Sequence, residues 1–120
     1  MPASPTIVGS LSDPGLRGAC RVRSGASGKL IYVSANFANA IAAVDVSTPT
    51  APRLVGSLTD RTHLSNVTGL DVSSSGRYII TASPRLATEV PPTLPLYPFQ
   101  LGFTGVVPTG TVAVIDLEAT

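Results

Sequence analysis

The sequence predicts an all-β fold of short antiparallel strands, and three observations support this prediction. The 120 residues are 43% apolar and only 12% charged, which is enough apolar material to build a core. Eleven Gly and eleven Pro residues are many for helices but normal for short strands joined by tight turns. Short blocks of sequence also recur along the chain in a fixed order, which is typical of repeated structural units.

The repeated blocks are related by two different spacings. Residues 8–13 (VGSLSD) recur as residues 55–60 (VGSLTD), 47 positions later, and a second block, GKLIY, recurs as GRYII 48 positions later. Residues 41–46 (IAAVDV) recur as residues 112–117 (VAVIDL), but 71 positions later. The second copy therefore contains an insertion of about 23 residues. We place it within residues 84–110, where six prolines gather.

The first three strands follow from the pattern of side chains. Residues 6–11 form a short apolar run that ends at the turn sequence DPG. Residues 18–23 alternate weakly between apolar and Arg side chains, which predicts a half-buried strand with Cys20 as a small buried thiol. Residues 29–35 are rich in β-branched and aromatic side chains, which is typical of a central strand buried on both faces.

The alanine-rich residues 40–46 are the one place where a helix competes with a strand, since alanine is a strong helix former. Their copy at residues 111–117 is dominated by Val, Ile and Thr, whose stiff side chains favour strands. We therefore predict strands in both copies, with residues 36–39 as a hairpin loop before the first. Residues 47–52 contain two prolines and predict a turn, and residues 53–58 predict another strand.

The second copy repeats this order of strands. Residues 60–66 predict a polar loop, and two more strands are predicted at residues 67–73 and 76–83 before the last one. Four short strands in about 47 residues match one blade of a β-propeller. The predicted units are the outer strand of a preceding blade at 6–11, a complete blade at 18–58, and three strands of the next blade at 67–117.

Two blades cannot close a propeller ring. Each blade buries both faces against its neighbours, so an isolated pair leaves apolar faces and unpaired strand edges in water. The partners we predict are therefore the remaining propeller blades or other copies of the chain itself. We expect these residues to be a piece of a longer propeller, with self-association of the chain as the alternative.

Three segments carry a resemblance to a known family: residues 32–34 (YVS), 43–49 (AVDVSTP) and 52–56 (PRLVG). They resemble the LVIVD and YVTN repeats of bacterial β-propellers, and the resemblance covers nearly the whole chain apart from the insertion. The second copy departs from the pattern at residues 80–82, where the aromatic side chain is lost, and at 117–120, where the turn is truncated. The resemblance implies the propeller fold and an extracellular or periplasmic location. It does not specify an activity, because such blades serve surface proteins, lactonase-like enzymes and binding scaffolds alike.

Charge and hydropathy exclude several classes of protein. The formal charge of +1 is spread without a basic run, so we expect no nucleic-acid partner. No apolar run approaches the ~20 residues that cross a bilayer, and the first residues lack the pattern of a signal peptide. A single cysteine excludes an internal disulfide framework and a multi-cysteine zinc site. We predict no metal and no cofactor.

The candidate site residues of the repeat lie in the loop after the first blade. In a propeller, the loop from an outer strand to the next inner strand opens onto the face with most binding sites, so the resemblance places Asp60, Arg61 and His63 near the channel mouth. A solvated polar loop and a ligand or metal contact are both compatible with these residues. No catalytic residue is predicted, because nothing fixes a Ser/His/Asp geometry around the single histidine. We expect Asp45 and Asp116, at equivalent strand ends, to accept hydrogen bonds from turn amides.

The insertion at residues 84–110 holds half of the six aromatic residues. A proline-rich segment does not easily form sheet ladders, yet one this apolar is expected to pack on a surface. One interpretation is a lid over exposed core, and the other is a partner or ligand surface on the same face as His63. The residues that we assign to such a surface are Leu96, Tyr97, Phe99 and Phe103.

Three classes of function remain. The first is a non-enzymatic scaffold for protein or ligand interaction, which we favour because no catalytic set converges and because it explains both the repeat and the apolar loop. The second is a fragment of a propeller enzyme, lactonase-like or a dehydrogenase subunit, which would need ligands from blades outside this sequence. The third is a self-assembling two-blade module that binds sugars. The absence of Trp argues against the third, since sugars usually stack on aromatic rings.

Overall fold

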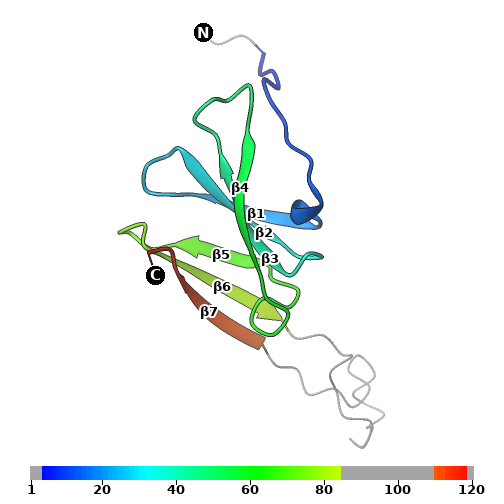
Figure 1. Ribbon diagram of the computed structural model, residues 1–120, viewed down its shortest axis with the longest axis vertical. Coiled ribbons are helices and arrows are strands. Elements are labelled where there is room, and N and C mark those ends of the chain that lie inside the picture. Colours follow the sequence, from blue (N-terminus) through cyan, green and yellow to red (C-terminus); the bar gives the residue numbers. More distant parts are fainter. Residues whose placement is uncertain (1–3, 85–109, 119–120) are drawn as a thin grey trace, which may run out of the picture.

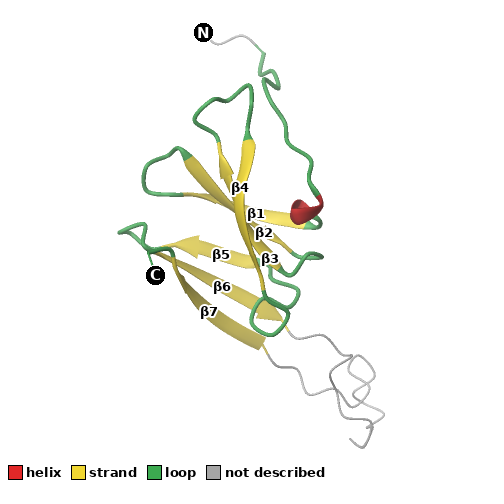
Figure 2. Cartoon of the chain, viewed as in Figure 1, coloured by secondary structure: helices red, strands yellow, loops and turns green. Residues whose placement is uncertain are grey.

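The computed structural model describes residues 4–84 and 110–118 and shows an all-β chain with two antiparallel sheets (Figures 1 and 2). Sheet A contains four strands in the order β1 (Ala19–Ser24), β2 (Leu30–Ala35), β3 (Ala40–Asp45) and β4 (Arg53–Thr59). Sheet B contains three strands in the order β5 (Gly69–Val72), β6 (Tyr78–Pro84) and β7 (Gly110–Asp116). One short 3-10 turn, η1 (Pro14–Leu16), precedes β1. The all-β prediction is confirmed.

Each strand pairs with the next one along the chain, so both sheets are simple antiparallel meanders. The alanine-rich segment forms strand β3, paired on one side with β2 and on the other with β4, so the choice of strand over helix is confirmed. A register shift between Ala43 and Val44 places a bulge in the β3–β4 ladder. β6 and β7 pair along their whole length, up to Pro84 opposite Gly110.

One face of sheet A packs against one face of sheet B, with β1 next to β5 (Figure 1). The side chains at the centre of this contact are buried, and they come from both sheets and from the loop between them: Tyr32, Ile41, Leu64, Val67, Leu70 and Ile79. Burial of an apolar side chain of this size contributes roughly 1.5–3 kcal/mol. The contact between the sheets is thus the main apolar core of the described chain.

The other face of sheet B is apolar and exposed. On β7, Val112 and Val114 alternate with the half-buried Ala113 and Ile115, as the period of two residues in a strand requires. The exposed fraction of Val112 is 72%, and this residue pairs with Ala82 of β6. Among the described residues, no other sheet covers this face, and β7 is the edge strand of its sheet.

Two features of the described chain differ from what the sequence led us to expect. Residues 6–11 form no strand, because a strand needs a neighbouring ladder and the described chain offers none at this place; Gly9 lies instead against Pro49 and Pro52. Cys20 is exposed rather than buried. The physical reason is that β1 has a neighbour on one side only, and a register shift next to Cys20 distorts its ladder with β2.

The tight turns before β2 and β6 allow a test of the contact between the sheets. Gly28 and Gly76 occupy equivalent repeat positions with φ of 75° and 78°, a region that costs other residues about 1–2 kcal/mol. A Cβ added at Gly28 would meet nothing within 4 Å, whereas one at Gly76 would lie 2.5 Å from Ala26 Cβ. We expect Gly76→Ala to lower the free energy of unfolding by a further ~1–3 kcal/mol relative to Gly28→Ala in urea titrations. Equal losses would mean that the two turns do not touch, and Ala26→Gly should remove most of the difference.

The buried and exposed faces of sheet B should respond differently to truncation. Ile79 is 1% exposed, so Ile79→Ala should lower the free energy of unfolding by about 2–5 kcal/mol, since it leaves a cavity between the sheets. Val112→Ala, on the exposed face, should change it by no more than about 0.5 kcal/mol when both are measured by urea unfolding at low protein concentration. A large loss for Val112→Ala under these conditions would show that this face is closed within a single chain.

Candidate functional site

The loop between β4 and β5 is built around Asp60. Its Oδ1 atom accepts hydrogen bonds from the backbone N–H groups of Thr62, at 2.9 Å, and His63, at 2.8 Å, and its Oδ2 atom lies 3.2 Å from His63 Nδ1. The Asp60 carbonyl also accepts a hydrogen bond from the Leu64 N–H. A short side-chain acceptor at the start of a turn commonly bonds to the amides that follow it. The carboxylate therefore organises its own loop.

Hydrogen bonds keep the Asp60 carboxylate in its ionised form. The backbone N–H of His63 has the largest effect and the His63 side chain the next, and together they lower the pKa of Asp60 below its ordinary value. At neutral pH the side chain is thus an acceptor, and it cannot act as a general acid. The His63 side chain is 63% exposed and points its imidazole into solvent-accessible space beside this carboxylate.

Three asparagines hold the loop against the β2–β3 turn. Asn36 Nδ2 donates to the Asn66 carbonyl at 2.8 Å, and Asn39 Oδ1 accepts from the Asn66 N–H at 2.9 Å. Asn39 and Asn66 have φ of 53° and 58°, a left-handed conformation that Asn tolerates better than most residues. The Asp60 N–H also donates to the Asn39 carbonyl. The loop is therefore fixed to the β2–β3 turn of sheet A by polar contacts.

A hollow of about 340 Å³ opens beside this loop. It lies between the end of β4, the loop and β7, and its walls are mostly apolar with one carboxylate and one imidazole. The residues that line it are Leu58, Asp60, His63, Leu64, Ala113, Val114 and Ile115. The structure thus brings two of the predicted site residues, Asp60 and His63, to one hollow. Arg61 is exposed and does not line it.

The ends of the long connection between β6 and β7 lie next to the same loop. Ser83 Oγ, one residue before the end of β6, donates to the His63 carbonyl at 3.3 Å. The connection therefore leaves and re-enters sheet B on the side of His63. The four predicted surface residues within it, Leu96, Tyr97, Phe99 and Phe103, lie outside the described residues, so their assignment stays a prediction.

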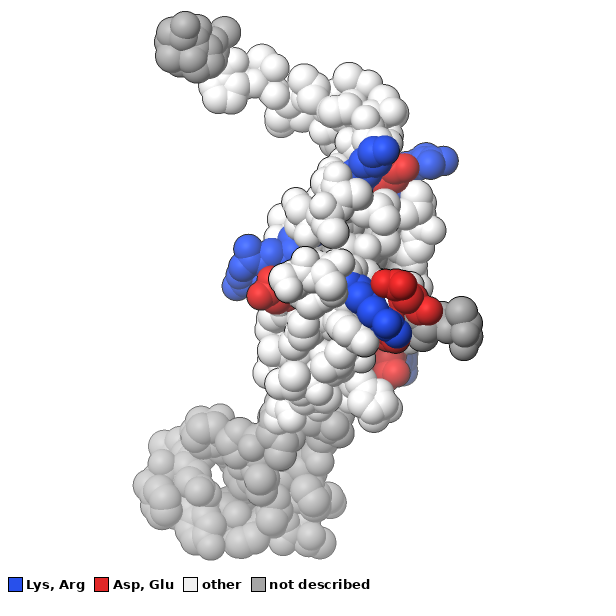
Figure 3. Space-filling view, turned by 90° about the vertical axis from the view of Figure 1, so that its left-hand side faces the viewer, with Lys and Arg blue, Asp and Glu red and all other residues white. Residues whose placement is uncertain are grey.

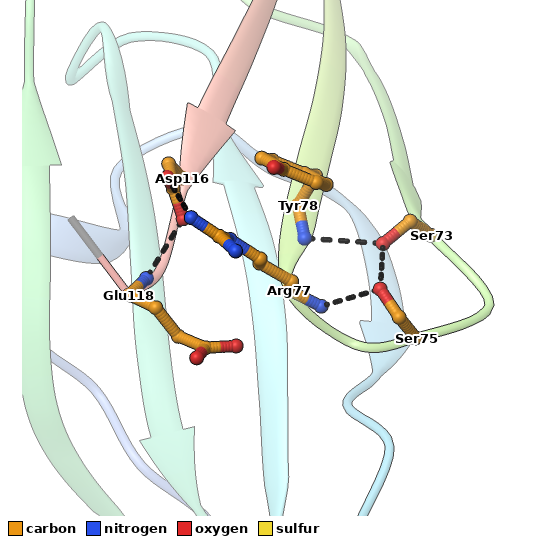
Figure 4. Close-up of polar contacts among 6 residues, drawn as sticks. All are labelled: Ser73, Ser75, Arg77, Tyr78, Asp116 and Glu118. Carbon is orange, nitrogen blue, oxygen red and sulfur yellow. Dashed lines mark hydrogen bonds and ion pairs between the residues drawn. The ribbon is translucent and has the colours of Figure 1, made fainter.

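A second polar cluster lies at the opposite ends of β6 and β7 (Figure 4). Arg77 donates from Nε and from a terminal nitrogen to the two oxygens of Asp116, both at 3.0 Å, and its guanidinium carbon lies 5.2 Å from the centroid of the Tyr78 ring. The pKa of Asp116 is lowered below its ordinary value. The hydrogen bonds from Arg77 have the largest effect, and the hydrogen bond from the backbone N–H of Glu118 has the next largest. The cluster joins the two strands where the sheet ends.

Asp45 and Asp116 have the structural role predicted for them. Asp45 Oδ1 accepts hydrogen bonds from the N–H and the hydroxyl of Ser47, and Asp116 Oδ1 accepts one from the N–H of Glu118. In both cases the acceptor lies two residues before the donor, so the carboxylate closes a turn at the end of the strand. This prediction is confirmed.

Metal ligands and charged patches give no further site in the described part of the chain. No group of three or more His, Cys, Asp or Glu side chains is close enough there to hold a metal ion. On the face drawn in Figure 3, acidic and basic side chains form small mixed groups separated by uncharged surface. In the described residues, no helix is long enough and apolar enough to cross a membrane.

Two contacts at these sites were not predicted from the sequence. The asparagine contacts join a hairpin turn to a loop about 30 residues further along the chain, and nothing in the local sequence pairs them. The ion pair between Arg77 and Asp116 did have a signal in the sequence. The repeat makes Arg77 the equivalent of Lys29, and each of these basic residues comes just before a strand. In both copies the start of that strand pairs with an Asp at the end of the following strand.

No protein-family model matches the sequence, and no curated protein matches it. Among solved structures, the chain is similar to a hypothetical selenium-binding protein from Sulfolobus tokodaii, with 16% sequence identity and a TM-score of 0.48. The match covers 54% of this chain and 17% of that chain. No functional conclusion follows from a likeness at this level.

The ion pair at the end of sheet B should make stability depend on pH. Because the folded-state pKa of Asp116 is lower than its ordinary value of 3.8, its contribution to stability is present above that pH and is lost as the pH falls through the folded-state pKa. Asp116→Asn keeps the shape of the side chain and removes its charge. We expect the difference in free energy of unfolding between wild type and variant to be present at about pH 5–7 and to vanish near pH 2. A difference that persists unchanged in acid would contradict this assignment.

Proposed function

We propose that the chain forms two adjoining blades of a β-propeller and serves as a non-enzymatic scaffold for protein or ligand interaction. Sheet A has the four antiparallel strands in sequential order that define a blade. Sheet B repeats that order for three strands. The resemblance to LVIVD and YVTN repeats supports the same assignment, since the Asp and Ser of the AVDVSTP segment form the turn that ends β3.

One observation carries the proposal. Ile41 of sheet A and Val112 of sheet B are equivalent in the repeat, yet Ile41 is 4% exposed and Val112 is 72% exposed. Ile41 is buried because sheet B covers it. The equivalent face of sheet B is apolar, so we expect a further sheet to cover it. This is the arrangement in a propeller, where each blade covers the face of its neighbour. Further blades, from a longer chain or from other copies, would cover Val112 and Val114.

The geometry of the carboxylates favours a scaffold over an enzyme. Asp45, Asp60 and Asp116 each accept hydrogen bonds from the amides of their own turn, so each has a structural role. The hollow beside His63 is mainly apolar and lies where the β6–β7 connection leaves the sheet, which is the end at which we propose that a partner or ligand binds. Hydrolysis of a lactone by the purified chain, lost in His63→Ala, would contradict the non-enzymatic assignment.

Lysine substitutions on the two equivalent faces test the proposal. Val112→Lys with Val114→Lys should leave the far-ultraviolet circular dichroism of the chain unchanged and should abolish association of the purified chain, because this face is covered only by other sheets. The control is Ile41→Lys, which places a charge in the core between the sheets and should unfold the chain. Unfolding of the double valine variant would contradict the proposal, and so would a wild-type chain that neither associates nor binds a dye specific for exposed apolar surface.

A further inference from the structure

We propose that residues 6–11 of one copy of the chain pair with the free edge of β7 in a second copy and complete sheet B as its fourth strand. This inference rests on the proposed function, because it takes the chain to form propeller blades and names a second copy of the chain as the neighbour of sheet B. It also assigns a role to an N-terminal segment that joins no sheet in its own chain.

The sequence of the segment is that of an outer strand. Residues 6–13 (TIVGSLSD) align with residues 53–60 (RLVGSLTD), which form β4, the outer strand of sheet A, and the first residue of the next loop. In the structure, Ile7 is 90% exposed and Val8 is also exposed. An apolar β-branched side chain in water without a ladder is unfavourable, and pairing with a strand edge would partly bury Ile7, as it does its equivalent Leu54 in β4.

The turn that follows the segment shares one contact with the turn that follows β4. Asp13 Oδ1 accepts a hydrogen bond from Gly15 N–H at 2.8 Å, as Asp60 Oδ1 does from the amide two residues later. The Asp13 carbonyl accepts a hydrogen bond from Leu16 N–H, three residues later, and the Asp60 carbonyl accepts one from Leu64 N–H, four residues later. The connection from residues 6–11 into sheet A therefore begins with the same carboxylate-to-amide contact as the connection from β4 into sheet B.

The ladder between β3 and β4 gives the expected register. Its observed pairs are Ile41 with Leu58, Ala42 with Ser57, Ala43 with Gly56, Val44 with Leu54, and Asp45 with Arg53. Adding 71 to the β3 positions and subtracting 47 from the β4 positions transfers this ladder to the new pair of strands. The pairs expected between copies are Val112 with Leu11, Ala113 with Ser10, Val114 with Gly9, Ile115 with Ile7, and Asp116 with Thr6.

The donor must be a second copy. In Figure 1 the N-terminal segment runs along the side of sheet A, at the opposite end of the molecule from β7, and η1 packs against β2 and β3 at its end. The segment cannot reach β7 of its own chain while η1 stays in place. Pairing with a second copy needs no such movement, and it brings sheet A of the donor against the exposed face of sheet B in the acceptor.

The face of sheet A that would meet Val112 and Val114 is also apolar. It is a shallow hollow on the side of sheet A away from sheet B, and it includes Val22, Ile31 and Val33. The contact is head to tail, so repeated copies close into a ring when the rotation between them allows it. Propellers have about 4–8 blades, so a closed ring would contain about two to four copies.

Cysteine cross-linking tests the register. In a Cys20→Ser background, a chain with Ser10→Cys is mixed with a size-tagged chain with Ala113→Cys, so that only pairing between copies gives a heterodimer of distinct mass. We expect a strong heterodimer band on non-reducing gels. The matched control replaces Ala113→Cys by Thr111→Cys, two positions along β7, where the Cα atoms would be about 7–8 Å apart and beyond the usual reach of a disulfide. The heterodimer yield should then be at least about ten-fold lower. Equal yields in the two mixtures would overturn the register.

A proline variant tests the pairing itself. Ser10→Pro removes a backbone N–H from the donated strand but alters no sheet of its own chain, so circular dichroism should not change. We expect light scattering to give a mass of about two to four copies for the wild type and one copy for Ser10→Pro, with Ser4→Pro as the wild-type-like control. A wild-type chain that stays monomeric, or association that Ser10→Pro does not affect, would overturn strand donation. The valine variants would still test the proposed function, because they do not involve residues 6–11.

Discussion

The fold depends on the burial of one sheet face against another. A strand with apolar side chains on both faces is stable only if both faces are covered, and here the inner faces of sheets A and B cover each other through Tyr32, Ile41 and Ile79. The polar contacts sit around this core and set its geometry. The asparagine contacts fix the loop between the sheets at one end, and the close approach of Gly76 to Ala26 sets their spacing at the other.

The strands were predictable from the sequence because the repeat and the side-chain period agree. The alanines of β3 favour a helix by propensity, and the β-branched copy in β7 resolved the choice correctly. Residues 6–11 form no strand in the described chain, and Cys20 is exposed rather than buried, for a shared reason. Whether a segment forms a strand, or a strand buries its side chains, depends on a neighbouring ladder, and no local pattern shows whether that neighbour lies in the same chain.

The candidate site was predictable only in part. The turn-closing roles of Asp45 and Asp116 follow from a short acceptor placed two residues before a free amide, which is a local relation. The placing of His63 beside Ala113 and Val114 is not local, because it joins a loop to a strand about 50 residues away. The asparagine contacts depend in addition on the left-handed backbone of Asn39 and Asn66. These residues meet only because the two sheets pack together, so their neighbours in sequence do not predict the contacts.

The pairing of Pro84 with Gly110 has a consequence for the long connection between these two residues. The last rung of the β6–β7 ladder brings both ends of the connection to adjacent positions on a formed sheet. The entropy of closing such a connection grows only with the logarithm of its length, by about 0.6 kcal/mol for each doubling. The hairpin thus acts as an insertion point. The length of the connection can therefore change at nearly constant cost to the stability of the sheets.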